Sequence, residues 1–343
     1  MLAEVKNVTL KVVSSFVSKN CLPIEDRLGK FISEKKIARL KKQVGFEAFS
    51  VVEKNICTSD LCFAAAEKIF EETNISKNEI GAIIFVSQTP DYFLPSTAHL
   101  LQNKLRLSEN VLAFDVGLGC SGFVYGLYIA SSLLQNIHAE KILLLCGDTI
   151  SKIIFEEDIS CLSVLGDAGT AAIISKSEGE KIFFNLQSFG EFSDDIIVNR
   201  GAFRNPAVVE NNSLNVRENF AVMDGAKVLN FSTKFVPSNL IELMKFSKIN
   251  PAEVGNFFLH QANKMILQDI AFNLNLPVEK FPFRSEKIGN TSSASIPVTL
   301  TEMERRGENF KTLSVMSGFG VGMSIASAVI DLKDLICIPT GEM

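Results

Sequence analysis

The chain has few histidines, fewer basic than acidic residues and no long apolar run. The 343 residues include three histidines, His99, His138 and His260, so a mechanism that needs an imidazole has three candidates. A net charge of −5 argues against general binding to nucleic acid or to an anionic membrane. No apolar segment reaches the length of a membrane span, and the first residues alternate like a strand and not like a signal peptide. We therefore expect a cytoplasmic protein.

The cysteines also lack the spacing that is typical of metal ligands. The seven cysteines are scattered, and Cys57 and Cys62 have no histidine beside them. A zinc site needs closer ligand pairs, so we expect no metal, and we expect most cysteines to be small buried apolar residues. Apolar residues make up 47% of the chain, which excludes a disordered protein and favours a large α/β core.

Strand patterns alternate with helical patterns along the whole chain. Ile80–Val86 and Lys141–Asp148 are continuous apolar runs, as in strands that are covered on both faces. We expect Thr58 and Ser59 to cap a helix that follows them. Strands that alternate with helices predict mainly parallel sheets. Further strands are expected at 4–15, 111–116, 256–259 and 312–317, and helices within 25–42, 61–72, 96–105, 121–134, 223–244, 264–274 and up to 305.

The order of these motifs repeats once. Both halves contain the same three units in the same order. The first unit is a strand, a loop and a helix, the second is a strand, a small turn and a helix, and the third is a strand, a glycine turn and a strand. In this correspondence Val86–Gln88 matches Leu259–Gln261, and Cys120 matches Asn290. We interpret the pattern as an internal duplication of two βα-rich halves that share one core. The expected halves are 1–176 and 177–343.

The stretch Asp115–Leu127 places a cysteine where an apolar strand meets a helix. Gly117, Gly119 and Gly122 surround Cys120, let the backbone turn sharply and leave space beside the sulfur. A helix N-terminus carries partial positive charge and free N–H groups, both of which favour a thiolate. These residues alone leave two interpretations open, a packing cysteine and a nucleophile.

Three motifs of the second half lie at strand ends and turns that correspond to those of the first half. His260 follows an apolar strand and precedes Gln-Ala-Asn, where a ligand crevice is expected, although a core histidine is equally consistent. Asn290 lies in Gly-Asn-Thr-Ser-Ser and is also consistent with a helix cap, and Gly318–Gly322 with a simple turn. In combination, a thiolate, an imidazole, a carboxamide and a loop rich in N–H groups indicate an acyl-transfer site.

With these motifs the sequence resembles β-ketoacyl-acyl-carrier-protein synthase III, the priming condensing enzyme of the thiolase superfamily. The resemblance implies an α/β thiolase fold, two similar βα halves in an α-β-α-β-α arrangement, and a homodimer. It also implies that acyl carrier protein is a partner and that no cofactor is needed. The residues that carry it are Asp115–Leu127, Gly166–Ala172, His260–Asn263, 289–297 and Gly318–Gly322.

The same resemblance implies a role for each site residue. Cys120 would be the acylated nucleophile, and its backbone N–H and that of Val321 would form the oxyanion hole. His260 and Asn290 would hold the thioester oxygen of a malonyl group while it loses carbon dioxide, so that a decarboxylative Claisen condensation gives a β-ketoacyl thioester. The expected substrate-binding residues are Met223, Gly225, Asn263, Phe319 and Leu94.

Several positions depart from the family pattern. Gln43 begins the stretch that is usually Arg-Thr-Gly-Ile, and Phe49 and Ile159 stand where arginines that clasp coenzyme A are common. Without a guanidinium fork, bidentate phosphate recognition is lost, which favours a donor on a carrier protein over acyl-coenzyme A. The alternative is that neighbouring lysines hold coenzyme A instead.

Two further departures concern the carrier and the acyl group. Met265 replaces an arginine that helps dock the acidic carrier protein, and Lys264 beside it is the candidate substitute. Leu94 replaces a large aromatic residue that closes the acyl tunnel across the dimer, which favours an acyl group longer than acetyl. The region Phe189–Asn219 is expected to cover the entrance.

Other functions stay open at this point. Relatives with the same Cys–His–Asn set condense other partners in quinolone, long-chain ketone or polyketide pathways, and some only transfer the acyl group. A non-catalytic subunit would normally lack the nucleophile, whereas this chain keeps it. A cysteine hydrolase would need an imidazole paired with the thiol.

Overall fold

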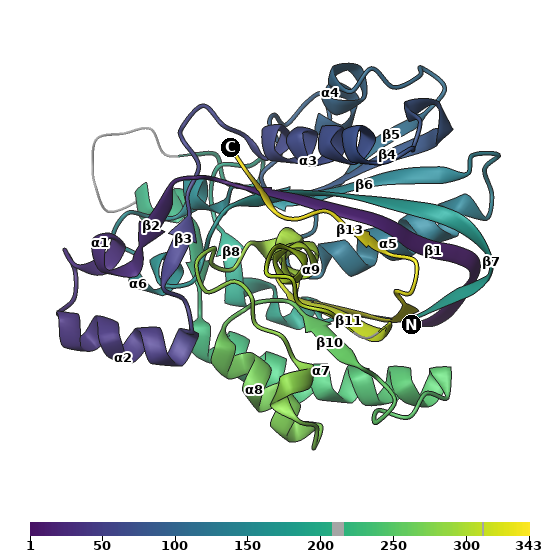
Figure 1. Ribbon diagram of the computed structural model, residues 1–343. Helices are drawn as coiled ribbons and strands as arrows, with labels where there is room; N and C mark the ends of the chain where they lie inside the picture. The colour runs from purple at the N-terminus through teal and green to yellow at the C-terminus, as the bar shows by residue number, and fades with distance from the viewer. Residues whose placement is uncertain (208–215, 311) are drawn as a thin grey trace.

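Five layers follow one another in the order helix, sheet, helix, sheet, helix (Figure 1). The computed structural model describes residues 1–207, 216–310 and 312–343. The two outer layers contain α3 and α4 on one side and α7 and α8 on the other, and α5 and α9 lie between the sheets. The expected α-β-α-β-α arrangement is therefore confirmed. These helices are α3 (Thr58–Glu72), α4 (Thr97–Lys104), α5 (Gly122–Leu134), α7 (Gly225–Ser247), α8 (Lys264–Asn273) and α9 (Ser295–Arg305).

The strands of both sheet layers are joined by hydrogen bonds into one continuous path. The first layer contains β5, β4 and β6, and the second contains β10, β11 and β12, with β7 between the two groups. The bounds are β4 (Ile80–Val86), β5 (Leu112–Val116), β6 (Lys141–Asp148), β7 (Ala168–Ser188), β10 (Asn256–Leu259), β11 (Leu313–Gly320) and β12 (Ser324–Asp331). The shorter strands are β2 (Cys21–Pro23), β3 (Ala48–Ser50), β8 (Ile196–Val198), β9 (Ala221–Met223), β13 (Ile336–Cys337) and β14 (Gly341–Glu342).

A long antiparallel ribbon of β1 (Leu2–Val17) and β7 runs through both sheet layers. β7 pairs with β6 as far as Ser175 and with β12 from Phe183 onward. The expected boundary between residues 176 and 177 thus falls inside β7, in the short segment where its neighbour changes. The division of the chain into two halves stays a prediction.

The expectation of mainly parallel sheets is wrong, because the sheet is mixed. The pairs β4–β5, β4–β6 and β10–β11 are parallel, whereas β6–β7, β7–β12 and β11–β12 are antiparallel. A parallel pair needs a long crossover connection, usually a helix. Residues 321–323 join β11 to β12 directly, and only the four-residue helix α6 (Ile159–Leu162) and a 3-10 turn lie between β6 and β7. Each glycine turn therefore reverses the chain into an antiparallel neighbour.

The predicted helices are present, with one correction at a helix start. The segment 25–42 forms α1 (Ile24–Leu28) and α2 (Glu34–Val44). Thr58 and Ser59 do not cap α3, because the helix already includes them. The carboxylate of Asp60 instead accepts a hydrogen bond at 2.9 Å from the backbone N–H of Cys57, which precedes the helix. No helix in the described parts of the chain is long and apolar enough to cross a membrane.

Both faces of β4 are buried, as its continuous apolar run predicts. Ile84 packs in the cluster around α5, and its neighbours Ile83 and Phe85 pack in the cluster around α3 and α4. Successive side chains of a strand point to opposite faces, so each face is covered by its own helix layer. The polar side chains that follow these strands are thereby left at the strand ends, where the site lies.

Candidate active site

A cavity of about 380 Å³ lies where β4, β10 and β11 end and α5 begins. Cys120, His260 and Asn290 all line it, although they are far apart in the sequence. The wall is mostly apolar, and no lysine or arginine is among the described residues that line it. Of the other residues expected at the site, the cavity wall includes Met223, Gly225, Asn263, Phe319 and Val321. The described residues contain no group of three or more His, Cys, Asp or Glu side chains that could hold a metal ion.

Cys120 stands two residues before α5, against the end of β11. Gly320 has a φ of +147°, and a Cβ there would lie 2.8 Å from the Cβ of Cys120 and 2.9 Å from its sulfur. Only glycine permits this backbone conformation together with so close an approach. The glycine loop therefore brings the amide of Val321 to the sulfur, and this amide and that of Cys120 both lower the pKa of the thiol.

The sequence leaves the protonation state of Cys120 open, and the structure indicates a neutral thiol. Burial raises the pKa of the thiol to about 11, and this effect exceeds the opposing effect of Ser292 and the two amides. The Oγ of Ser292 lies 4.0 Å from the sulfur. The resting group is thus a neutral thiol at pH 7, because the cost of desolvating a charge outweighs what these hydrogen bonds contribute.

His260 is only 2% exposed and follows directly on β10. Its Nδ1 lies 2.7 Å from the Oγ of Ser295, and its ring meets Phe319 edge to face at 5.5 Å. Burial lowers the pKa of the imidazole to about 3, so the ring is neutral at pH 7. A neutral imidazole has one N–H and one acceptor nitrogen. The hydrogen bond with Ser295 can determine which of the two nitrogens carries the proton.

Asn290 is held in a turn rather than at the cap of α9. Its Oδ1 accepts a hydrogen bond of 2.9 Å from the backbone N–H of Ser292, and its own N–H donates to the carbonyl of Val164 at 2.7 Å. The residue that precedes α9 is Ala294. Because the carboxamide oxygen is engaged in the turn, the Nδ2 group is the part that can donate toward the cavity.

One polar residue near the site, Asp148, was not predicted from the sequence. Asp148, fully buried at the end of β6, accepts hydrogen bonds from the N–H of Gln88 at 2.7 Å and from the Oγ of Ser293 at 3.1 Å. Gln88 itself lines the cavity. Asp148 thereby connects the loop after β4 with the turn that contains Asn290. Its only signal in the sequence is an acidic residue at the end of an apolar strand.

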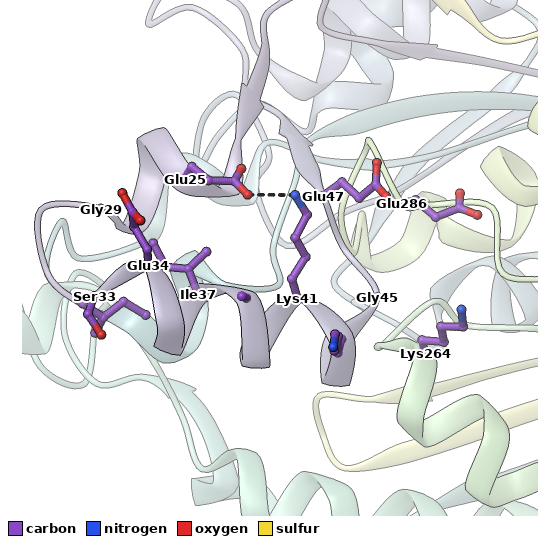
Figure 2. A pocket seen from close by; sticks show the side chains of 13 residues that line it. Glu25, Gly29, Ser33, Glu34, Ile37, Lys41, Gly45, Glu47, Lys264 and Glu286 are labelled. Atoms are coloured by element: carbon purple, nitrogen blue, oxygen red, sulfur yellow. Dashed lines mark hydrogen bonds and ion pairs between the residues drawn. The ribbon is translucent and has the colours of Figure 1, made fainter.

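Two expected residues lie outside the cavity wall. Leu94 is 79% exposed in the loop before α4. Lys264 is exposed at the start of α8 and lines a separate groove beside α2, in which Gly45 lies next to it (Figure 2).

The region Phe189–Asn219 contributes to the wall through β8. Ile196, Ile197 and Val198 of this strand all line the cavity. Residues 208–215 of the same region lie outside the described part of the chain, so its expected role over the entrance stays a prediction.

Comparison with known proteins agrees with these motifs. Residues 114–190 match the family model described as 3-oxoacyl-[acyl-carrier-protein (ACP)] synthase III, and residues 244–332 match the model of its C-terminal part. A putative 3-oxoacyl-[acyl-carrier-protein] synthase 3 of Campylobacter jejuni is 37% identical over 329 residues, which cover 93% of this chain and 92% of that protein.

Solved structures show the same likeness. A 3-oxoacyl-(acyl-carrier protein) synthase from Burkholderia xenovorans LB400 is similar with a TM-score of 0.93 at 32% identity, covering 100% of this chain and 99% of that chain. OleA from Xanthomonas campestris shares the fold, with a TM-score of 0.80 at 19% identity and coverage of 96% of this chain and 97% of that chain.

The layered fold and the cysteine at a helix start define a thiolase-fold acyltransferase. More narrowly, the chain belongs to the 3-oxoacyl-[acyl-carrier-protein] synthase III family.

Proposed function

We propose that the chain transfers an acyl group from a thioester to Cys120 and condenses it with the malonyl group of malonyl-acyl carrier protein. The observation that carries this proposal is that Cys120, His260 and Asn290 line one cavity with an apolar wall. Related enzymes that condense other partners share the fold, but the example described above is only 19% identical. The product is a β-ketoacyl thioester.

In the first step the sulfur of Cys120 attacks the carbonyl carbon of the donor thioester. The C–S bond to the sulfur of Cys120 forms, the C–S bond to the carrier breaks, and the thiol proton passes to the departing sulfur. The oxyanion of this step is held by the backbone N–H groups of Cys120 and Val321, since both act on the sulfur. Loss of one such donor typically lowers the rate by about two to three powers of ten.

In the second step His260 and Asn290 hold the thioester oxygen of the malonyl group. Decarboxylation breaks the bond to the carboxylate, releases carbon dioxide and leaves an enolate whose negative charge lies on this oxygen. Nδ1 of His260 lies 2.7 Å from the Oγ of Ser295, and in the proposed tautomer Ser295 donates to Nδ1, so that Nε2 carries the ring proton and donates it to the thioester oxygen. Two neutral donors in a buried site stabilise that charge better than water does.

The enolate carbon then attacks the acyl group on Cys120. A carbon–carbon bond forms, the C–S bond to Cys120 breaks, and the sulfur takes up a proton. No step needs a metal or a cofactor. The substrate wall is formed by Met223, Gly225, Asn263 and Phe319.

The donor is carried on a protein in this proposal, and acyl-coenzyme A is the alternative. Phe49 is fully buried under the guanidinium of Arg27 at 4.5 Å, and that guanidinium donates to the carbonyl of Leu165. This arginine is therefore engaged inside the protein, and no cation lines the described cavity wall to take the phosphates of coenzyme A.

The proposed working form is a homodimer in the cytoplasm. β5 is an edge strand whose only sheet partner among the described residues is β4, and the exposed Leu94 lies in the loop after β4. In a dimer through this edge, Leu94 of each copy closes the acyl site of the other. All seven cysteines are free thiols, which suits a reducing compartment.

Intact-mass analysis of the acylated protein tests this function and its donor. We would offer acetyl, hexanoyl and longer acyl groups, each on coenzyme A and on acyl carrier protein. The expected result is a mass increase from carrier-borne groups that Cys120→Ala abolishes. Equal or stronger labelling by the coenzyme A esters would contradict the carrier assignment, and labelling of Cys120→Ala would contradict the nucleophile.

A further inference from the structure

Ser292 places a hydroxyl group against the sulfur of Cys120. Its side chain is 2% exposed and lines the cavity. The thiol of Cys120 donates a hydrogen bond to the Oγ of Ser292 at 4.0 Å, and the hydroxyl of Ser292 donates in turn to the Oε1 of Gln88 at 3.4 Å. Both hydrogen bonds run in one direction, from the thiol through the hydroxyl to an amide oxygen. A lone pair of the Oγ therefore faces the thiol proton.

The backbone of Ser292 has a conformation that disfavours a side chain. Its φ is +52°, in the left-handed region that glycine adopts readily and that strains a residue with a Cβ. The backbone N–H of Ser292 donates to the Oδ1 of Asn290 at 2.9 Å, and a glycine would provide the same N–H. The turn thus keeps a hydroxyl beside the sulfur in spite of backbone strain, which is a common feature of functional sites.

Two further contacts hold this hydroxyl in place. A Cβ on Gly119 would lie 2.0 Å from the Oε1 of Gln88, so the amide packs directly against the loop that contains the reactive cysteine. The buried Asp148 accepts hydrogen bonds from the backbone N–H of Gln88 at 2.7 Å and from the Oγ of Ser293 at 3.1 Å. Asp148 therefore fixes both the residue that accepts from Ser292 and the turn that contains it.

Few other groups in the cavity wall could move the proton of Cys120. No carboxylate, lysine or arginine is among the wall residues that the structure describes. Burial lowers the pKa of His260 to about 3, which makes its imidazole a weak base. The second serine of the wall, Ser232, donates to the carbonyl of Val228 at 2.8 Å within α7. The hydroxyl of Ser292 can accept one proton while it gives up another, so no charge has to form in the buried site.

We propose that Ser292 is a further catalytic residue, which carries the proton between the two sulfur atoms during acylation. This proposal rests on the proposed function, because it concerns the first step of that reaction. As the sulfur of Cys120 attacks, its S–H bond breaks and an O–H bond to the Oγ of Ser292 forms. The original O–H bond of Ser292 breaks, and its proton forms the S–H bond of the departing thiol. Catalytic hydrogen bonds of free enzymes are often long and shorten in the substrate complex, as the 4.0 Å contact requires.

The test compares two thioesters of similar size whose leaving groups differ in acidity. Hexanoyl-ethanethiol releases an alkylthiolate that needs a proton, whereas hexanoyl-trifluoroethanethiol releases a more stable thiolate that departs without one. Intact-mass time courses follow the acylation of Cys120 by each ester. The variants are Ser292→Gly, which relieves the backbone strain, and Ser292→Ala. Ser131→Ala is the control, because it removes a buried hydroxyl of α5.

Both Ser292 variants should be acylated by the ethanethiol ester about a hundred times more slowly than the wild type, as is typical when a proton-transfer group is lost. With the trifluoroethanethiol ester the loss should be about tenfold or less, since only the proton of Cys120 then has to be taken up. The control should keep both wild-type rates. A mere displacement of the sulfur would slow both esters by the same factor. An equal loss with the two esters, or no loss with the ethanethiol ester, would therefore overturn the assignment.

Hexanoyl-acyl carrier protein is the third donor, and its leaving group is also an alkylthiol. If this donor does not acylate the wild-type protein, the proposed function itself fails. If it acylates the wild type and Ser292→Gly at equal rates, the role of Ser292 is wrong while the proposed function stands.

Discussion

At Cys120 and His260, burial sets the protonation state. It raises the pKa of the thiol to about 11 and lowers that of the imidazole to about 3, so both groups are neutral at pH 7. A thiolate–imidazolium pair, as in a hydrolase, is therefore not the resting state. In the proposed mechanism the sulfur therefore loses its proton during acyl transfer, and the imidazole acts as a neutral donor.

The first prediction concerns the alkylation of Cys120. Only the thiolate reacts, so the rate with iodoacetamide should still be rising above pH 9 and should level off near pH 11. The charge of Asp148 contributes to the raised pKa, and Asp148→Asn should shift the profile to lower pH. Mass spectrometry of the labelled peptide separates Cys120 from the other cysteines. A plateau below pH 9 in the wild-type protein would contradict the neutral thiol.

A second prediction links His260 to acid sensitivity. Its pKa is about 3 in the fold, against 6.5 for an unperturbed histidine. Between these two values the unfolded chain binds one more proton than the folded chain, so stability falls as the pH falls. The contribution of a single group is about 1.4 kcal/mol per pH unit. Urea unfolding at several pH values between 6 and 4 gives the free energy of unfolding as a function of pH. We expect this free energy to depend less steeply on pH in His260→Gln than in the wild type, by about this amount. If the free energy of unfolding depends on pH equally in both proteins, folding does not change the proton binding of His260. The buried ring would then take up a proton as the unfolded one does.

Among the elements, those with a strong periodic pattern were predictable. The runs of β4 and β6 and the helix α5 follow directly from the apolar period, and the strand–Cys120–helix joint follows from its glycines. Strand direction was not predictable in the same way. It depends on which distant strand becomes the neighbour after each glycine turn, and pairing between β7 and β12 is invisible in either segment alone.

The site was predictable in part for a similar reason. Cys120, His260 and Asn290 carry chemistry in their motifs, and the repeated order predicted that they meet. Asp148 and Ser295 act through side-chain hydrogen bonds to residues far away in the chain, which no local pattern reveals. The raised pKa of Cys120 was likewise not predictable, since the sequence does not show how much water reaches a sulfur.

Gly320 offers the third prediction, on the turn between β11 and β12. Gly320→Ala would place a methyl group within 3 Å of the sulfur of Cys120, in a backbone conformation that alanine rarely adopts. Acylation of Cys120 should fall by at least about a hundredfold, because one oxyanion donor moves away as the sulfur is obstructed. Gly190→Ala serves as a control, as a Cβ there meets nothing within 4 Å. Intact-mass time courses measure both, and equal rates would show that the close approach is not needed.

For the whole molecule, the fourth prediction concerns the dimer. Leu112 begins the edge strand β5 and is 48% exposed, so a second copy that pairs along this edge would cover it. Leu112→Lys should shift the protein toward the monomer in light scattering coupled to gel filtration. Ile336→Lys on β13 is the control, because Ile336 is exposed to a similar degree elsewhere. A wild-type monomer, or a control that dissociates as readily, would rule out the β5 edge as the interface.

The central claim is that the cavity divides the chemistry between Cys120, which holds the acyl group, and His260 with Asn290, which drive decarboxylation. The most direct measurement is carbon dioxide release from malonyl-acyl carrier protein by protein that mass spectrometry shows to be acylated. We predict that His260→Ala is acylated at Cys120 as the wild type is, and releases carbon dioxide about a hundred to a thousand times more slowly. An unchanged rate of release from acylated His260→Ala would contradict the account.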